Sequence, residues 1–230
     1  MKKRLFLTTL ILFILSCEMN KHEYFPVVEG MQWVYSVKIN SSYTGKSYNK
    51  RVMITNYGVK KNKNSLEISK LYSDGSFYTY EIVKNQLRRT SVIISFSDGI
   101  VEPVKKIIYP DLFFNQVKWV VKEQLFLVKG FQPPLLNVKP RSQFNMIYTV
   151  KKKYKTFVEN GQSFKNCIEI VGNGSTNFIG DTRSGPIKVD IKNLEVLCDG
   201  VGLVKQVRSE NTEASAFGNM TLTKSLLNLN

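Results

Sequence analysis

Large apolar residues alternate with polar ones along much of this chain, with a period of two residues. In the segment 33–39 (WVYSVKI) the large apolar side chains all fall on odd positions. This alternation is typical of a β-strand with one buried and one solvated face. Similar short runs, rich in β-branched and aromatic residues, predict further strands at about 50–57, 65–72, 77–84, 87–97, 144–158, 162–172, 187–197, 202–210 and 217–226.

Turn-forming residues separate these predicted strands. The pairs Asp74-Gly75, Asn85-Gln86 and Asp98-Gly99 indicate hairpin turns in the first half of the chain. In the second half, breaks are expected at Gly161, at Gly172-Asn173-Gly174 and at Gly185-Pro186. No segment carries a sustained helical stripe, and no βαβ alternation is visible. The pattern therefore predicts an all-β, mainly antiparallel fold, a meander that forms a half-barrel, a barrel or a sandwich.

The middle of the chain is less regular. Pro103 would place a strand over 100–109 at a sheet edge or a bulge. The run 111–129 fits two strands or a short helix followed by a strand, and its β-branched and aromatic content favours strands. The two prolines in 131–136 (FQPPLL) indicate an extended connection. We therefore expect a single β-rich domain over residues 25–230, with a possible seam near 130–141.

The first 17 residues (MKKRLFLTTLILFILSC) have the composition of a secretory leader. A charged start precedes an apolar run over 5–15, which is far shorter than the roughly 20 residues that span a bilayer. The segment Ile14-Leu15-Ser16-Cys17 resembles the lipobox of bacterial lipoproteins. That resemblance implies a signal peptide over 1–16, a lipid attached to Cys17 and a tether to residue 24. The alternative is an ordinary secreted protein in which Cys17 has no special role.

Lipidation at Cys17 would make the membrane itself a partner, because two or more acyl chains hold a protein stably. The expected location is the cell envelope. Glu18 follows the cysteine where an Asp would resemble an inner-membrane retention signal. In a Gram-negative cell this favours the outer membrane, with the domain facing the periplasm.

The chain is strongly basic, with a formal net charge of +15 that falls to +12 once Lys2, Lys3 and Arg4 are removed. Lysines cluster over 60–63 and 151–155. They fit either solvated turns and strand faces or a surface that attracts anionic lipid or acidic glycan. Nucleic acid is not an expected partner, because the chain is exported and carries no recognition motif.

Two cysteines remain once Cys17 is assigned to the lipid. Cys167 and Cys198 form an even pair in an oxidising compartment, where a disulfide is expected. The alternative is a pair of buried thiols that act as small apolar side chains. The sequence favours the disulfide.

Groups that carry catalysis are scarce. The single histidine, His22, lies in the tether, which argues against a Ser-His-Asp triad or a multi-histidine metal site. No phosphate-binding loop or dinucleotide fingerprint occurs. A carboxylate pair could form among Asp74, Asp98, Asp181, Asp190 and Asp199, but most of these sit in turn contexts, where Asp is favoured for local hydrogen bonding. We therefore expect no catalytic residues, no metal and no cofactor, and we do not expect an enzyme.

Three motifs resemble a broad group of uncharacterised bacterial secreted proteins and lipoproteins. They are the opening 24–35 (YFPVVEGMQWVY), the segment 161–167 (GQSFKNC) and the segment 200–205 (GVGLVK). The resemblance implies a β-rich domain with no established reaction. Members usually have an aromatic-Ala-Pro piece where this chain has 197–199 (LCD), which strengthens the pairing of Cys198 with Cys167.

The residues in these motifs have structural explanations. Trp33 and Tyr35 would be buried on one face of the first strand. Gly200 suits a turn with positive φ, and Gly202 suits a bulge or a close backbone approach.

Two hypotheses about function follow from these features. The first is a lipid-anchored, non-catalytic envelope protein that acts as a binding or assembly module, with another envelope protein as its possible partner. The alternative is a carrier that holds an acyl chain or another apolar ligand in a curved sheet, suggested by the apolar-rich stretch 113–136.

Overall fold

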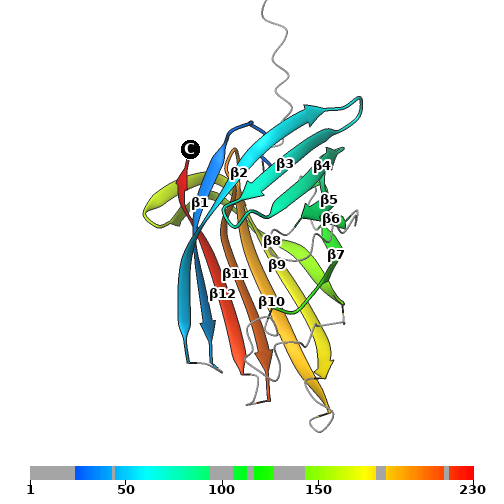
Figure 1. Ribbon diagram of the computed structural model, residues 1–230, viewed down its shortest axis with the longest axis vertical. Coiled ribbons are helices and arrows are strands. Elements are labelled where there is room, and N and C mark those ends of the chain that lie inside the picture. Colours follow the sequence, from blue (N-terminus) through cyan, green and yellow to red (C-terminus); the bar gives the residue numbers. More distant parts are fainter. Residues whose placement is uncertain are drawn as a thin grey trace, which may run out of the picture.

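The computed structural model describes residues 24–42, 45–93, 106–112, 117–126, 143–179, 185–214 and 218–230. These residues form twelve β-strands (Figure 1). The strands are β1 (Gln32–Ser41), β2 (Ser47–Lys61), β3 (Leu66–Tyr72), β4 (Phe77–Val83), β5 (Gln86–Ile93), β6 (Lys106–Tyr109), β7 (Lys118–Glu123), β8 (Phe144–Glu159), β9 (Gln162–Ile179), β10 (Pro186–Cys198), β11 (Gly202–Thr212) and β12 (Asn219–Leu229).

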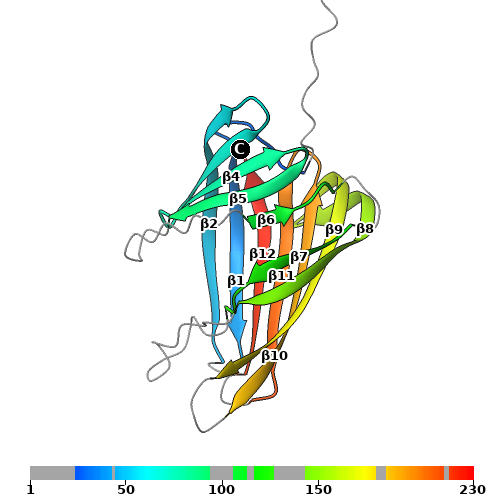
Figure 2. The ribbon, with the colours of Figure 1, turned by 90° about the vertical axis from the view of Figure 1, so that its right-hand side faces the viewer.

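All twelve strands belong to one antiparallel sheet, in the order β6-β5-β4-β3-β2-β1-β12-β11-β10-β9-β8-β7. The sheet consists of two six-stranded meanders, which the pairing of β1 with β12 joins. It curls into a nearly closed barrel, so that the edge strands β6 and β7 lie near each other in front of β12 and β11 (Figure 2). The predicted all-β antiparallel meander is therefore confirmed, as a barrel.

The two barrel edges, β6 and β7, are joined by side chains instead of a backbone ladder. The indole nitrogen of Trp119 on β7 donates a hydrogen bond to the carbonyl oxygen of Ile108 on β6, at 3.0 Å. The ammonium group of Lys106 lies 3.3 Å from a carboxylate oxygen of Glu123. These contacts hold together strands that are far apart in the sheet order.

The alternation of apolar and polar residues places the core on the concave face. On β10 the burial pattern alternates strictly from Pro186 to Asn193, with Ile187, Val189 and Ile191 inside. The turn expected at Asn85-Gln86 occurs one residue earlier, at Lys84-Asn85, and the break expected at Gly161 occurs at Asn160-Gly161. Left-handed residues permit a tight connection at both places. Within the described ranges no helix is long and apolar enough to cross a membrane.

The break expected at Gly172-Asn173-Gly174 is wrong, because β9 continues through it to Ile179. These two glycines do not form a turn; they leave space for side chains of the neighbouring strand. A Cβ atom added to Gly172 would lie 2.5 Å from the Tyr148 ring, and one added to Gly174 would lie 2.5 Å from the sulfur of Met146. Large side chains of β8 therefore pack directly on the β9 backbone, which is the other common reason for glycine in a strand.

The middle of the chain was predicted less accurately. The described part of 111–129 holds one strand, β7, and the buried Leu125 follows it outside the sheet. Of the expected strand over 100–109, residues 106–109 form β6. The possible seam near 130–141 lies outside the described residues, as do most of the apolar stretch 113–136, Cys17 and His22.

Candidate functional site

The residues of the motifs at 24–35 and 200–205 lie together and stabilise one end of the sheet. The Trp33 indole nitrogen donates a hydrogen bond to the carbonyl oxygen of Val201 at 2.7 Å. The Tyr35 hydroxyl donates to the carbonyl oxygen of Leu203 at 2.8 Å. Both aromatic side chains are buried. They therefore have a structural role in this region.

The glycines in the second motif allow close packing at the same place. Gly200 and Gly202 both have positive φ angles, of 69° and 83°. A Cβ atom on Gly202 would approach the Pro26 ring to 3.3 Å. The opening segment of the domain therefore packs against the start of β11, where only glycine fits without strain.

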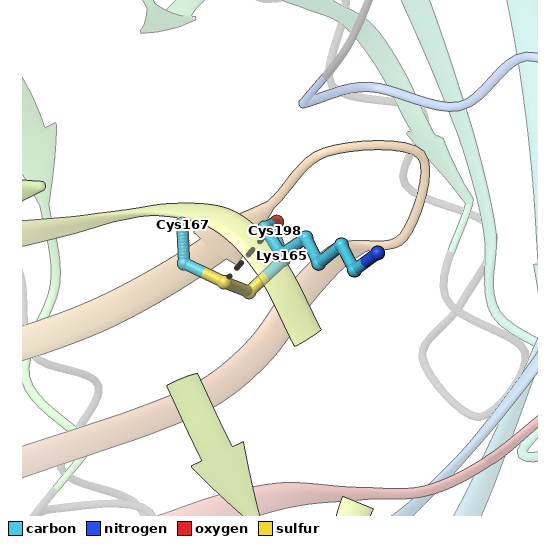
Figure 3. The surroundings of a disulfide bond; sticks show 3 residues. All are labelled: Lys165, Cys167 and Cys198. Carbon is cyan, nitrogen blue, oxygen red and sulfur yellow. Dashed lines mark hydrogen bonds between the residues drawn. A yellow bond between two sulfur atoms is a disulfide. The ribbon is translucent and has the colours of Figure 1, made fainter. Parts of the chain in front are cut away.

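Cys167 and Cys198 form a disulfide bond (Figure 3). The two residues lie directly opposite each other in the β9–β10 ladder, and both are buried. Beyond this point the tip of the β8–β9 hairpin turns back to β11 and β12. There the Asn160 side-chain amide donates to the carbonyl oxygen of Leu226 at 2.7 Å. The bond therefore fastens the base of this hairpin to β10.

The aspartates considered as a carboxylate pair do not come together within the described residues. An oxygen of the Asp74 carboxylate accepts a hydrogen bond from the backbone N–H of Ser76, which is a local turn contact. Asp190 is exposed and pairs with Lys188. Asp199 lies in the turn between β10 and β11. Asp98 and Asp181 are outside the described ranges.

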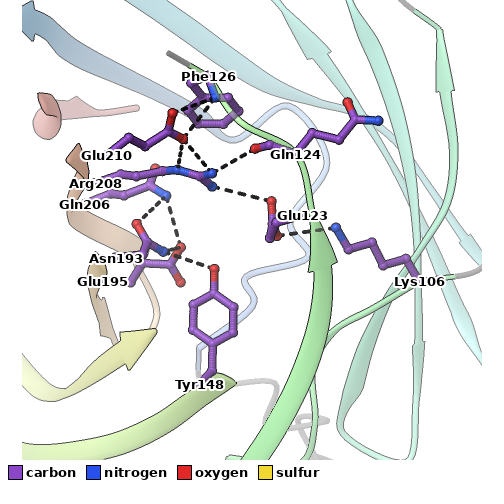
Figure 4. Close-up of polar contacts among 10 residues, drawn as sticks. All are labelled: Lys106, Glu123, Gln124, Phe126, Tyr148, Asn193, Glu195, Gln206, Arg208 and Glu210. Atoms are coloured by element: carbon purple, nitrogen blue, oxygen red, sulfur yellow. Dashed lines mark hydrogen bonds and ion pairs between the residues drawn. The ribbon is translucent and has the colours of Figure 1, made fainter. Parts of the chain in front are cut away.

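Instead, the structure places a network of charged residues inside the barrel, beside its edges (Figure 4). Its centre is Arg208 on β11, whose side chain is 3 % exposed. The guanidinium donates to a carboxylate oxygen of Glu210 at 2.8 Å and to the carbonyl oxygen of Gln124 at 2.8 Å. It also lies 3.5 Å from the carboxylate of Glu123, which binds Lys106 on β6. We call Lys106, Glu123, Arg208 and Glu210 the arginine network.

Every charged group of the arginine network has a partner of opposite charge. The carboxylate of Glu210 is fully buried, and it also accepts hydrogen bonds at 2.9 Å from the backbone N–H of Phe126. The Phe126 ring lies 4.1 Å from the guanidinium carbon of Arg208. Such complete pairing offsets the cost of removing charges from water. The arginine network therefore acts to position the segment after β7 against β11.

A second buried carboxylate, Glu195, lies next to this network and is held by neutral donors. The hydroxyl of Tyr109 donates to one of its oxygens at 2.6 Å, and the amides of Asn193 and Gln206 donate to the other. Burial raises the pKa of Glu195, and the hydrogen bond from Tyr109 acts in the opposite direction. Burial also raises the pKa of Tyr148, whose hydroxyl accepts a hydrogen bond from Asn193.

Two lysines on the concave face are surrounded differently. Lys70 follows the buried Ile68 by two residues on β3, and Lys224 precedes the buried Leu226 by two on β12, so both point inward. The Lys70 ammonium lies 4.4 Å from the centre of the Trp33 ring. These two lysines, with the aromatic rings of Trp33, Tyr35, Tyr72 and Tyr80, are called the lysine cluster below.

The aromatic rings of the lysine cluster connect the two ammonium groups. Lys224 lies 4.2 Å from the centre of the Tyr35 ring and 6.0 Å from that of Tyr72. The hydroxyls of Tyr72 and Tyr80 are hydrogen-bonded to each other, and Lys70 lies 6.0 Å from the Tyr80 ring. Burial lowers the pKa of each lysine to about 8, and repulsion from Lys224 adds to the effect at Lys70. No Asp or Glu of the described residues lies within ion-pair distance of either.

Sequence reasoning named Trp33 and Tyr35 as buried but missed the charged and amide residues of the interior, although a signal is present. Asn193 and Glu195 occupy the same strand face as Val189 and Ile191, so the alternation places polar side chains on the buried side. Arg208 and Glu210 continue the buried face of Val204 in the same way. Polar residues at apolar positions of a period-two pattern are therefore the feature that could have located the site.

The described residues contain no group of three or more His, Cys, Asp or Glu side chains arranged to hold a metal ion. The described interior presents cations, carboxylates, amides, tyrosine hydroxyls and aromatic rings. Such groups bind polar or charged ligands and orient them.

Comparison with known proteins supports the fold. No protein-family model matches the chain. No curated protein sequence matches it either. A predicted exported protein with a YmcC-like fold from Bacteroides fragilis superposes with a TM-score of 0.50 at 12% identity, over 90% of this chain and 99% of that one. A predicted lipoprotein from Parabacteroides distasonis gives 0.49 at 13% identity, over 90% and 98%. The chain therefore shares the fold of the Bacteroides fragilis protein.

Proposed function

We propose that this chain is a lipid-anchored, non-catalytic binding module of the cell envelope, with its binding site inside the barrel. The observation that carries the proposal is the lysine cluster, where two inward-pointing cations face aromatic rings without a carboxylate partner in the described residues. A barrel stabilised only by its core would fill these positions with apolar side chains, because unpaired buried charges are costly.

The proposed location is the outer membrane, with the domain facing the periplasm and attached through Cys17. The lipobox-like segment 14–17 supports this location, as does a disulfide of the kind found in exported proteins. The predicted exported protein from Bacteroides fragilis that shares this fold supports the broader part of this proposal, a location in the cell envelope.

The anchor is tested by replacing Cys17 with Ser and separating membrane from soluble fractions. We expect the wild-type protein in the membrane fraction, with an intact mass that includes acyl chains on a chain that begins at Cys17. The Cys17→Ser protein should lose this mass. An intact mass without any acyl chain on Cys17, in protein from native membranes, would disprove lipidation.

A protein partner is tested by photo-crosslinking from the outer face of the barrel. Tyr57 and Val120 are suitable positions, because 65% and 55% of their surfaces are exposed. If the domain is an assembly module, a crosslinker at one of these positions should give an adduct of defined mass in intact cells. The same crosslinker at the buried Ile191 serves as the control.

The second candidate function is that of a carrier for an acyl chain or a similar apolar ligand. The aromatic lining of the lysine cluster favours it, because the partly exposed rings of Tyr72 and Tyr80 present apolar surface to the interior. A carrier should release lipid on organic extraction after purification in a mild non-ionic detergent. Extracts without stoichiometric lipid, together with a reproducible crosslinked protein, would favour the assembly module.

A further inference from the structure

We propose that Lys70 and Lys224 together bind the anionic group, a carboxylate or a phosphate, of a ligand that lies inside the barrel. This inference rests on the proposed binding function and names the chemistry of the ligand. It rests on the positions of the two ammonium groups and on the absence of carboxylate partners within the described chain.

The sheet brings the two lysines to one place from distant parts of the sequence. Lys70 lies on β3 and Lys224 on β12, and β2 and β1 separate these strands in the sheet. Trp33 and Tyr35, the rings beneath the two ammonium groups, are two residues apart on β1. Two residues along a strand span roughly 7 Å. A carboxylate or phosphate group, with its oxygens spread over two or three directions, can contact two cations that lie over such neighbouring rings.

The two cations of the arginine network already have carboxylate partners. Arg208 pairs with Glu210 and Glu123, and Lys106 pairs with Glu123. None of the five ion pairs that the described residues form includes Lys70 or Lys224. The only carboxylate with a marked electrostatic effect on Lys224 is that of Glu195, which hydrogen bonds from Tyr109, Asn193 and Gln206 already hold.

Aromatic rings compensate these cations only in part. A cation over a ring gains on the order of 1–2 kcal/mol, which is less than the cost of removing an ammonium group from water. The lowered pKa values of both lysines agree with this imbalance. An anion would supply the missing partner, and charge-assisted hydrogen bonds to it are stronger than those between neutral groups. The partly exposed rings of Tyr72 and Tyr80 would contact the apolar part of the same ligand.

Three probes with the same chain and different head groups test the inference: octanoate, octyl phosphate and octanol. Each is titrated into the full-length lipidated protein in a fixed concentration of non-ionic detergent, with tryptophan fluorescence as the readout. Trp33 lies under Lys70 and should report occupation of the site. The variants are Lys70→Gln with Lys224→Gln, and the matched control is Lys188→Gln, whose side chain is 63% exposed.

We expect at least one anionic probe to bind the wild type and the Lys188→Gln control with equal affinity. The double variant should bind that probe ten-fold or more weakly and should bind octanol within two-fold of the wild type. The comparison of octanoate with octyl phosphate shows whether a fatty acid or a phosphorylated lipid is the better match. Thermal unfolding of the double variant, with a transition as cooperative as that of the wild type, shows that the loss is not a folding defect.

Three results would overturn the inference. If anionic probes bind the double variant as tightly as the wild type, Lys70 and Lys224 do not contribute to binding of the anionic group. If octanol binds the wild type as tightly as the anionic probes, the site does not select an anionic group. The protein would then be a carrier for neutral apolar ligands, and the proposed binding function would stand without this inference. If no probe binds, the inference fails, and the crosslinking experiment decides whether a protein-binding function remains.

Discussion

Two groups of cations lie inside the same barrel, and they differ in whether carboxylates neutralise them. Arg208 in the arginine network has two carboxylates and a backbone carbonyl as partners, and its side chain is 3% exposed. Lys70 and Lys224 in the lysine cluster have aromatic rings as neighbours, and they are largely buried but more exposed than Arg208. A fully paired charge stabilises the fold, whereas a cation without a counter-charge is a site at which a ligand can gain binding energy.

The positions of the two groups support the same distinction. The arginine network lies where β6 and β7 meet and connects β11 to the segment after β7 (Figure 4). The lysine cluster lies over the continuous part of the sheet, on β1, β3, β4 and β12, where backbone ladders already fix the strands. Charges are therefore needed for stability at the barrel edges and are not needed at the lysine cluster.

The largest predicted effect is on stability at Arg208. Arg208→Met should destabilise the fold by about 3–5 kcal/mol, because it leaves the fully buried Glu210 without its cation. Equilibrium unfolding in urea, followed by tryptophan fluorescence, measures the change. A loss below about 1 kcal/mol would mean that water or another group replaces the guanidinium, and the distinction between paired and unpaired charges would fail.

Replacing Lys70 with Met should change the free energy of unfolding in the opposite direction. Lys70→Met keeps the length of the side chain and removes a poorly compensated cation, so we expect a gain of about 1–3 kcal/mol at pH 7. The ligand-free protein must be used, because a bound anion would stabilise the wild type. Differential scanning calorimetry with Lys188→Met as the exposed control checks this value. Destabilisation would show that Lys70 has a structural role like that of Arg208.

Stability should also rise with pH because of the lysine cluster. The pKa of Lys70 is lowered from 10.5 to about 8 in the folded state, and Lys224 behaves alike. Between these two values the unfolded chain binds more protons than the folded chain, so the free energy of unfolding increases with pH. Burial of Tyr35 raises its pKa and gives the opposite trend above pH 10, so the useful window is pH 8 to 9.5.

Urea unfolding across this window checks the pH dependence. We expect the wild type to gain on the order of 1 kcal/mol between pH 8 and 9.5. The gain should be smaller in Lys70→Met and smallest when Lys224 is also replaced. Equal slopes for wild type and double variant would show that both lysines keep ordinary pKa values in the folded protein.

The strand pattern of this fold could be read from the sequence because the core face alternates regularly. The strands expected at 144–158 and 202–210 are observed at Phe144–Glu159 and Gly202–Thr212. The main error was at Gly172, where glycine marks close packing by Tyr148 and not a turn. Local sequence cannot separate these two uses of glycine, because the difference depends on a residue of the neighbouring strand.

The candidate site was much less predictable. Its members come from strands that are distant in the sequence, and only the curl of the sheet brings Lys70 near Lys224. In the sequences of β3 and β12, the pattern around an inward-pointing lysine cannot be distinguished from that around a lysine at the solvated end of a strand. The pairing of Cys167 with Cys198 was favoured from the sequence because a count of cysteines in an exported chain limits the choices, and the structure contains that bond.

The smallest predicted effect concerns Lys106, the outermost member of the arginine network. Its ion pair with Glu123 has 15% and 21% of the two side chains exposed, so solvent weakens the interaction. Lys106→Met should therefore cost about 0.5–1 kcal/mol, far less than Arg208→Met, because Glu123 keeps Arg208 as a partner. Hydrogen exchange of the β6 and β7 amides provides a second readout, and faster exchange there without a global change is expected. A loss of stability as large as that of Arg208→Met would show that closure of the barrel edges depends on the Lys106–Glu123 ion pair. In that case the contact of β6 with β7, and not the buried Arg208, would be the main stabilising feature of the arginine network.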